Sequence, residues 1–479
     1  MVDVPSDPRM QCPVCGHPEI EAKGVDWSGN PRYCCRSCGE IFLVQVEMTD
    51  ADLPPEPEPK PRKPFPSPWR SIPILPIIPY LQQLGQRSLP GLTEAGIALL
   101  LGSLLFGIIH WLAPPETFYD YYLRLAHSFL DGQLCLSENP SWLNELVPIP
   151  GKGYCVVYPI APALFLLPLV KVFPTITQSE AAHLLFGLAA LAIYLFFRKQ
   201  QSSRFRSISL ALIWSFATIF FPMSAVGSVW YIAQTMGATF VWLFLLCFQP
   251  RPGGFLFLSG LCLGIAAAAR LPLNLLVLYG LVLLYRELAP RWSLLLRSTS
   301  IFFAGFLPLF LLQRLYNYAR YQTFADRGYA LIPGKFAEPE FQHGLFHPFN
   351  LPKHLRVLFL NLPKGVDHWP YLVPSHEGLS ILITSPFLVV AFWWLIKSRR
   401  WPEVGAILTI MVIEMCHGTV GYSQFGYRFA LDVYPLLFLA LPPILELRSL
   451  RSWLLGLIGL SGLVNLWGLL AFRYRWFIW

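Results

Sequence analysis

The chain has 479 residues, of which 54% are hydrophobic, 15% aromatic and only 13% charged. Soluble domains usually carry about a quarter charged residues, and apolar runs of about 20 residues, long enough to cross a bilayer, recur here from Leu92 to the C-terminus. This composition excludes an ordinary soluble protein. The formal net charge of +8 is explained by basic residues in short loops between spans, where they set topology, and a nucleic-acid partner is not expected.

A cysteine-rich head opens the chain. Its motifs Cys12-Pro-Val-Cys15-Gly and Cys35-Arg-Ser-Cys38-Gly are separated by 19 residues. Each motif can direct two thiolates at one point, and four thiolates make a closed tetrahedral zinc site. The pattern resembles zinc ribbons, so we predict a structural zinc at these four cysteines, without a catalytic role. A redox pair and unligated cysteines are the alternatives, and Cys34 could replace Cys35 at a less regular spacing.

Composition divides the chain into a head, a linker, an interfacial segment and a membrane domain. The predicted zinc ribbon occupies residues 10–47, followed by a proline-rich linker at 48–70. Prolines at 73, 76 and 79 argue against a regular span in 71–90, which we expect to lie at the interface. For residues 91–479 we predict an all-α polytopic fold with about eleven transmembrane helices. The expected spans are 92–112, 180–197, 207–223, 228–248, 254–270, 271–285, 298–313, 378–396, 403–421, 429–446 and 453–472.

The distribution of basic residues predicts the orientation. With the N-terminus in the cytoplasm, most basic residues of the connections also lie inside, and the two long loops, about 113–179 and 314–377, face the outside. This requires that the apolar stretch 155–173, interrupted by three prolines, lies in or dips into the outer face without crossing. We expect a multi-pass protein of a bacterial inner (plasma) membrane, although the basic C-terminus, outside in this arrangement, fits it poorly.

The first outer loop begins with a predicted amphipathic helix. Asp120, Arg124, His127 and Asp131 follow i, i+4, i+7, i+11 spacing and so share one helical face, and Gly132 ends the helix. We expect this helix on the outer membrane surface. Its polar face is either part of a functional site or a solvated face in which Asp120 pairs with Arg124.

Four motifs in this loop and beyond it occur together in one protein family. They are an acidic residue before YYLRLAHSFLDGQL, the run YPIAPALFLLP, the segment YNYARYQTFADRGY and the segment FGYRFALDVYP. Their order and outer placement resemble the C-type (GT-C) membrane glycosyltransferases, which include protein O-mannosyltransferases and the aminoarabinose transferases of lipid A. The resemblance covers most of residues 95–445 and excludes the head.

The resemblance implies a polyprenyl-phosphate sugar as donor. It also implies an acidic residue in the first outer loop that acts as general base or holds a metal for the acceptor. By position this residue is Asp120, and Glu145 is the candidate second acid. Relatives often have two adjacent acids where this chain has Asp120-Tyr121, so a divalent metal at the outer site stays open, in addition to the zinc of the head.

Glycosyl transfer from a lipid phosphate also needs a cation beside the departing phosphate, and the guanidinium fork of arginine suits it. Arg270, at the outer end of an apolar span, and Arg428 are the candidates. Arg270 could instead snorkel to the interface, and Arg428 could be structural, with Asp432 at i+4 as its expected partner. Glu414 and His417 fall within a span, and we assign them no role.

Together these features indicate a membrane enzyme that transfers a sugar from a polyprenyl-phosphate donor to a glycan, lipid or protein acceptor on the extracytoplasmic side, in contact with membrane lipids. Two alternatives come from other classes. A lipid or glycan transporter or flippase would place paired charges deep inside several spans. A catalytically inactive scaffold would use the zinc-ribbon head to bind partners and would not need Asp120.

Overall fold

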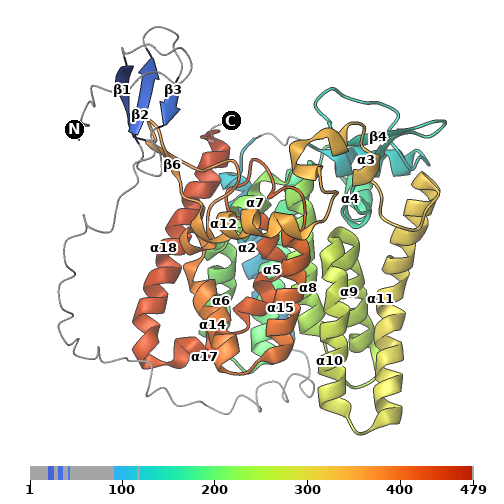
Figure 1. Ribbon diagram of the computed structural model, residues 1–479. Coiled ribbons are helices and arrows are strands. Elements are labelled where there is room, and N and C mark those ends of the chain that lie inside the picture. Colours follow the sequence, from blue (N-terminus) through green and yellow to red (C-terminus); the bar gives the residue numbers. More distant parts are fainter. Residues whose placement is uncertain (1–19, 26–30, 36–40, 44–90, 116–118, 477–479) are drawn as a thin grey trace. The chain divides into compact units, whose positions relative to one another are not determined.

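The computed structural model describes residues 20–25, 31–35, 41–43, 91–115 and 119–476. The chain divides into two compact units, Met1–Ser71 and Ile72–Trp479. In the first unit, strands β1 (Ile20–Val25), β2 (Pro31–Cys35) and β3 (Ile41–Leu43) form an antiparallel sheet in the order β1-β2-β3 (Figure 1). The predicted zinc ligands, the linker at 48–70 and the interfacial segment at 71–90 lie outside the residues and side chains that the structure describes.

The second unit is built mainly from helices. The α-helices are α2 Leu92–Leu112, α3 Tyr121–Leu130, α4 Ala161–Val172, α5 Gln178–Lys199, α6 Arg204–Ala217, α7 Phe220–Val226, α8 Val229–Cys247, α9 Gly254–Ala269, α10 Leu276–Leu288, α11 Trp292–Tyr321, α12 Leu351–Leu360, α13 Ile381–Thr384, α14 Pro386–Lys397, α15 Trp401–Met415, α16 Tyr434–Phe438, α17 Leu441–Glu446 and α18 Arg448–Arg473. The 3-10 helices are η2 Leu271–Leu275, η3 Tyr329–Leu331, η4 Lys335–Ala337, η5 Pro339–Phe341, η6 Pro348–Asn350 and η7 Arg428–Asp432. Two short antiparallel hairpins join β4 Leu146–Ile149 to β5 Gly153–Val156, and β6 Lys364–Gly365 to β7 Leu372–Val373.

Each predicted span coincides with helical structure, and 92–112 is reproduced residue for residue by α2. Within the described part of the chain, six helices are long and apolar enough to cross a membrane, or seven if α6 and α7 form one bent span. Shorter apolar helices lie at the predicted spans 254–270, 378–396 and 429–446, and α15 covers most of 403–421. The chain is therefore a multi-pass membrane protein, and the count of about eleven spans stays a prediction. The second long loop begins later than expected, because α11 continues to Tyr321.

The bend between α6 and α7 has a local cause. The axes of the two helices differ by 64°. At the break, the Thr218 hydroxyl donates to Trp214 O at 2.8 Å and accepts from Phe220 N at 3.2 Å. The side chain thus satisfies backbone groups that the interrupted helix would otherwise leave unpaired inside the bundle, where no water is at hand.

Small residues bring α9 and α11 into backbone contact. A Cβ atom placed on Gly260 would lie 2.0 Å from Phe302 O, and one placed on Gly305 would lie 2.0 Å from Phe257 O. Because helices in lipid gain little from burying apolar side chains against one another, close backbone approach at small residues is a main source of their association. The close contact between α9 and α11 fixes the positions of Arg270, which follows α9, and of the segment that follows α11.

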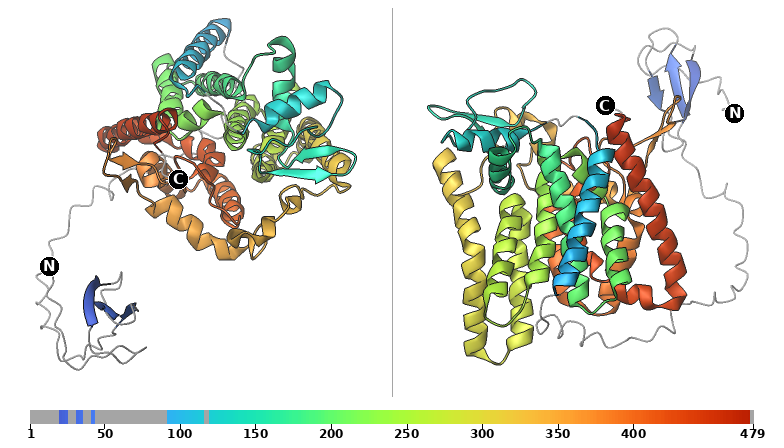
Figure 2. Two further views of the ribbon diagram at one scale, coloured as in Figure 1. Left: turned by 90° about the horizontal axis from the view of Figure 1, so that it is seen from above. Right: turned by 180° about the vertical axis from the view of Figure 1, so that it is seen from behind.

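The connections gather at two ends of this unit. The turn between α10 and α11 and helix α17 lie at one end, whereas α3, β4, α4 and α12 lie at the other (Figures 1 and 2). The predicted stretch 155–173 forms β5 and then the short helix α4, which contains Pro168. The predicted amphipathic helix is α3, which ends at Leu130 shortly before Gly132, at φ +72°. The cytoplasmic position of the N-terminus stays a prediction.

A disulfide joins Cys135 to Cys155 in the loop that contains α3 and the β4–β5 hairpin. The neighbouring residues Leu136 and Tyr154 exchange backbone hydrogen bonds of 2.9 Å, which place the two cysteines side by side. This bond was not predicted from the sequence. Disulfides persist in oxidising compartments, so the bond is in keeping with an extracytoplasmic position of this loop.

We predict that Cys135 and Cys155 are oxidised in protein isolated from cells. Alkylation of the denatured, unreduced protein should leave both unmodified, and mass spectrometry should find their peptides linked. Cys135→Ser is the matched control, because it should make Cys155 alkylable without reductant. Alkylation of both cysteines in the unreduced wild-type protein would contradict the disulfide and remove its support for an outer loop.

Candidate active site

A cavity of about 180 Å³ lies where the start of α8, η2, the end of α15 and η7 meet the segments after β5 and after α11. Most of its wall is apolar or aromatic. A few polar side chains converge on it, as is usual for ligand sites. These are Tyr122, Tyr158, Trp230, Arg270, Asp326, Tyr329, Glu414, His417, Thr419 and Arg428.

Arg270 is held by two carboxylates. Pro272 prevents α9 from continuing, so the backbone turns at Arg270 into η2 and its side chain reaches the bundle interior. Its Nη2 donates to Glu414 Oε1 at 2.6 Å and its Nε to Asp432 Oδ2 at 3.0 Å. The ion cluster ties η2, α15 and η7 together. Arg270 lines the cavity, but its charge is already balanced by two protein carboxylates, and its predicted contact with a donor phosphate stays a prediction.

Arg428 is not paired with a carboxylate among the residues that the structure describes. The side chain is 7% exposed, and its Nε and Nη1 atoms are buried without a hydrogen-bond partner among the residues that the structure describes. The guanidinium carbon lies 5.6 Å from the ring centre of Trp230 and 5.4 Å from that of Phe429. Aromatic faces attract a cation but do not replace the hydrogen bonds that it loses on leaving water.

The expected pairing of Arg428 with Asp432 is wrong. Residues four apart are neighbours on an α-helix, but Arg428–Asp432 is the 3-10 helix η7, with three residues per turn. Asp432 points instead to Arg270. Because η7 is a 3-10 helix, Asp432 pairs with Arg270, and Arg428 is the arginine left without a carboxylate in the described part of the chain.

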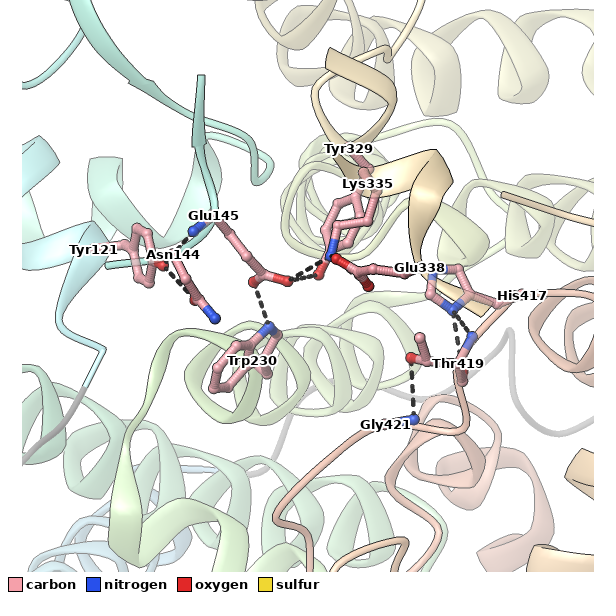
Figure 3. Close-up of polar contacts among 10 residues, drawn as sticks. All are labelled: Tyr121, Asn144, Glu145, Trp230, Tyr329, Lys335, Glu338, His417, Thr419 and Gly421. Carbon is pink, nitrogen blue, oxygen red and sulfur yellow. Dashed lines mark hydrogen bonds and ion pairs between the residues drawn. The ribbon is translucent and has the colours of Figure 1, made fainter. Parts of the chain in front are cut away.

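Glu145 is buried beside the cavity and bound on both oxygens (Figure 3). Tyr329 Oη donates to its Oε1 at 2.8 Å, and Trp230 Nε1 donates to its Oε2 at 3.2 Å. Lys335 Nζ lies 3.9 Å from Oε1, and the Glu145 N–H donates to Tyr121 Oη at 2.9 Å. Glu145 therefore fixes two aromatic side chains of the cavity wall, one of which also contacts Arg428.

Burial raises the pKa of the Glu145 carboxyl above its ordinary value. The hydrogen bond from Tyr329 and the positive charges of Lys335 and Arg428 act in the opposite direction. Two donated hydrogen bonds and a nearby ammonium suit a carboxylate, and they leave its oxygens little freedom to take up a proton from a ligand.

Asp120 lies at the start of α3 and pairs with Arg124. Arg124 Nε is 3.0 Å from Asp120 Oδ1, and the Asp120 side chain is 22% exposed. The Arg124 guanidinium also lies 5.7 Å from the ring centre of Trp142. The predicted i, i+4 pair is confirmed. Asp120 is not among the residues that line the cavity, and its catalytic role stays a prediction.

Several residues that line the cavity were not predicted from the sequence to be site residues. The hydroxyls of Tyr122 and Tyr158, Asp326 Oδ2 and Glu414 Oε2 are buried and have no hydrogen-bond partner in the described part of the chain. Their motifs were noticed, since Tyr122 follows Asp120-Tyr121, Tyr158 opens the YPIAPAL run, and Asp326 stands in the ADRGY segment. The motifs contain several other polar residues, so the sequence did not single these out.

The residues around the cavity do not form an evident metal site. Within the described residues there is no group of three or more His, Cys, Asp or Glu side chains placed to hold a metal ion. Asp120 is occupied by Arg124, and Glu145 by Tyr329 and Trp230. The divalent metal that the motif resemblance leaves open at this site stays a prediction.

No protein-family model matches the chain, and no curated protein matches its sequence. Among solved structures, it is similar to ArnT from Cupriavidus metallidurans bound to undecaprenyl phosphate, with a TM-score of 0.40, 11% identity, and coverage of 79% of this chain and 76% of that one. It is also similar to the oligosaccharyltransferase of Archaeoglobus fulgidus in the apo form, with a TM-score of 0.38 and 14% identity over 80% of this chain.

A third similar structure is the archaeal oligosaccharyltransferase AglB from Archaeoglobus fulgidus in complex with an inhibitory peptide and a dolichol-phosphate, with a TM-score of 0.36, 14% identity and coverage of 79% of this chain. The chain spans about half the length, 55%, of the Archaeoglobus proteins. At these scores and identities, the similarity alone assigns neither a family nor an activity.

The two cavity arginines should respond oppositely to removal. Arg270→Met strands the carboxylates of Glu414 and Asp432 inside the bundle, so we expect a loss of unfolding free energy on the order of 3–5 kcal/mol. Arg428→Met removes a buried cation whose Nε and Nη1 have no acceptor, so stability should stay unchanged or rise. Thermal unfolding of the detergent-solubilised proteins measures both. A similar large destabilisation by the two variants would show that Arg428 has a partner within the fold.

Proposed function

We propose that the protein is a membrane glycosyltransferase that takes a sugar from a polyprenyl-phosphate donor and transfers it to an acceptor on the extracytoplasmic side. The observation that carries the proposal is the unpartnered guanidinium of Arg428 in a mostly apolar cavity, next to side chains that suit a sugar. The donor class comes from the motif resemblance to C-type glycosyltransferases.

Burying Arg428 without an acceptor costs free energy. A buried donor left without an acceptor costs about 1–3 kcal/mol, and more for a charged group. Because Arg270 is already paired with Glu414 and Asp432, Arg428 is the arginine of the pair that can neutralise a ligand anion. Phosphate oxygens can accept hydrogen bonds from the Nε and Nη1 groups of a guanidinium, and in Arg428 both groups lack an acceptor among the described residues.

The cavity wall suits the rest of such a donor. Trp230, Tyr329 and Phe429 present aromatic rings, and apolar side chains surround them. Glu145 holds Trp230 and Tyr329 by hydrogen bonds, so the rings are fixed before a ligand arrives. We assign Glu145 this positioning role, while direct participation of Glu145 or Asp120 in catalysis stays a prediction.

Transfer then requires one bond exchange. The bond between the anomeric carbon and the phosphate oxygen breaks while a bond to the acceptor oxygen forms. The departing lipid phosphate keeps the electron pair and is stabilised by Arg428, which acts where negative charge develops. The acceptor hydroxyl loses its proton to a carboxylate.

The transporter or flippase alternative has one observation in its favour, the buried cluster of Arg270, Glu414 and Asp432. The cluster lies at the ends of α9 and α15 and borders the cavity, so it supports a site at one end of the bundle rather than a pathway of charges through several spans.

For the head we propose a structural zinc at Cys12, Cys15, Cys35 and Cys38. Metal analysis of the full-length protein should find one zinc per chain and none in the Cys12→Ser/Cys38→Ser double variant. Zinc retained in the double variant, or missing from the wild type, would contradict this assignment.

The phosphate assignment predicts a specific loss of binding. Arg428→Met should weaken binding of a polyprenyl phosphate in detergent at least tenfold, and Arg428→Lys should restore it in part, since an ammonium cannot reproduce the fork. Arg356→Met is the matched control, because Arg356 is exposed and pairs with Glu377 outside the cavity lining. Thermal shift with the phosphate, against the parent polyprenol, measures the effect. Equal binding of phosphate and polyprenol, or unchanged binding by Arg428→Met, would contradict the proposal.

A further inference from the structure

Three residues that line the same cavity, from two loops, each carry an oxygen atom without a hydrogen-bond partner in the described part of the chain. Tyr122 is 0% exposed and Tyr158 is 7% exposed, and the hydroxyls of both are buried without a hydrogen bond among the described residues. Asp326 Oδ2 is in the same condition, and all three residues line the cavity. Leaving buried polar groups unpaired costs about 1–3 kcal/mol each, so their joint presence in one cavity indicates a ligand that supplies several hydroxyl groups.

The two tyrosines cannot readily turn to other partners. The ring of Tyr158 packs against those of Tyr121 and Tyr122, with centres 5.5 and 6.0 Å away, and against that of Tyr329 at 6.0 Å. Tyr122 is fixed further by α3, whose backbone N–H groups at Tyr122 and Leu123 bind the Gln178 side chain at 3.0 and 3.1 Å. Burial raises the pKa of Tyr122, so its hydroxyl keeps its proton and can donate.

Asp326 stands in the segment that follows α11, close to two arginines that are engaged elsewhere. Arg320 donates to Val156 O and, at 2.8 Å, to Asn317 Oδ1. Arg314 Nη1 donates to Phe324 O at 3.2 Å. Burial raises the pKa of Asp326, with these positive charges and the Gly328 backbone N–H acting in the opposite direction. A carboxylate with a raised pKa is a stronger base than an exposed aspartate.

Resting on the glycosyltransferase function, we propose that Asp326, Tyr122 and Tyr158 form the acceptor subsite for a polyhydroxyl compound, in which Asp326 is the catalytic base. Asp326 Oδ2 accepts the proton of the attacking hydroxyl as its oxygen bonds to the anomeric carbon. The bond from that carbon to the phosphate oxygen breaks, and the lipid phosphate leaves with the electron pair. The two tyrosine hydroxyls bind neighbouring hydroxyls of the acceptor or the sugar.

The test compares Asp326→Asn with Asp120→Asn, Tyr122→Phe and the wild type. Each is expressed in a deletion strain, and the rate at which membranes form the missing glycoconjugate is measured. We expect Asp326→Asn to lower the rate by about 10² to 10⁴, because asparagine keeps the shape but cannot accept the proton. Polyprenyl-phosphate binding and thermal unfolding should stay as in the wild type, since Arg428 and the helix packing are untouched. Tyr122→Phe should lower the rate less.

Two outcomes overturn the assignment of Asp326 and leave the proposed function standing. One is a normal rate with Asp326→Asn, and the other is a loss confined to Asp120→Asn, which would give the role of base to Asp120. If Asp326→Asn unfolds the protein, Asp326→Glu is the variant to measure. Its displaced carboxylate should restore folding but only part of the rate. A full rate with Asp326→Glu would also overturn the assignment of Asp326. A deletion strain with a normal glycoconjugate profile, together with wild-type protein that does not bind the lipid phosphate, would instead contradict the proposed function itself.

Discussion

The buried guanidinium of Arg270 is the constraint on which the site depends. A charge inside a bundle must be balanced, and here the carboxylates of Glu414 and Asp432 both turn to it. This joins η2, α15 and η7, which are distant in sequence, at one end of the helices. Because Asp432 pairs with Arg270, the buried Arg428 has no hydrogen-bond partner at Nε or Nη1 among the described residues.

The other residues of the site surround the cavity that Arg428 lines. Trp230 connects its two sides, since the indole N–H binds Glu145 and the ring lies beside Arg428. The lining segment after β5 is held by the Cys135–Cys155 disulfide and by hydrogen bonds from Arg320 and Tyr321 to Val156 O. These contacts fix the loop segments around a small cavity. Its lining residues carry unpaired donor and acceptor atoms, as preorganised sites require.

The sequence predicted what depends on local pattern. Apolar run length located the helices, down to the limits of α2, and i, i+4 spacing predicted the pair of Asp120 and Arg124, because both signals are set within a few turns. The partner of Arg428 was mispredicted because the same spacing was applied to a 3-10 helix. The disulfide and the convergence of Tyr122, Tyr158 and Asp326 depend on tertiary contacts between distant segments, and no local pattern carries that information.

Arg428, whose Nε and Nη1 have no partner within the described residues, is proposed to bind a lipid-linked phosphate. The most direct measurement is an experimental structure of the protein in nanodiscs with a polyprenyl phosphate added. The account predicts phosphate oxygens within hydrogen-bond distance of the Arg428 guanidinium, with Arg270 still on Glu414 and Asp432. A phosphate bound elsewhere, with Arg428 paired to a carboxylate of the protein, would contradict it.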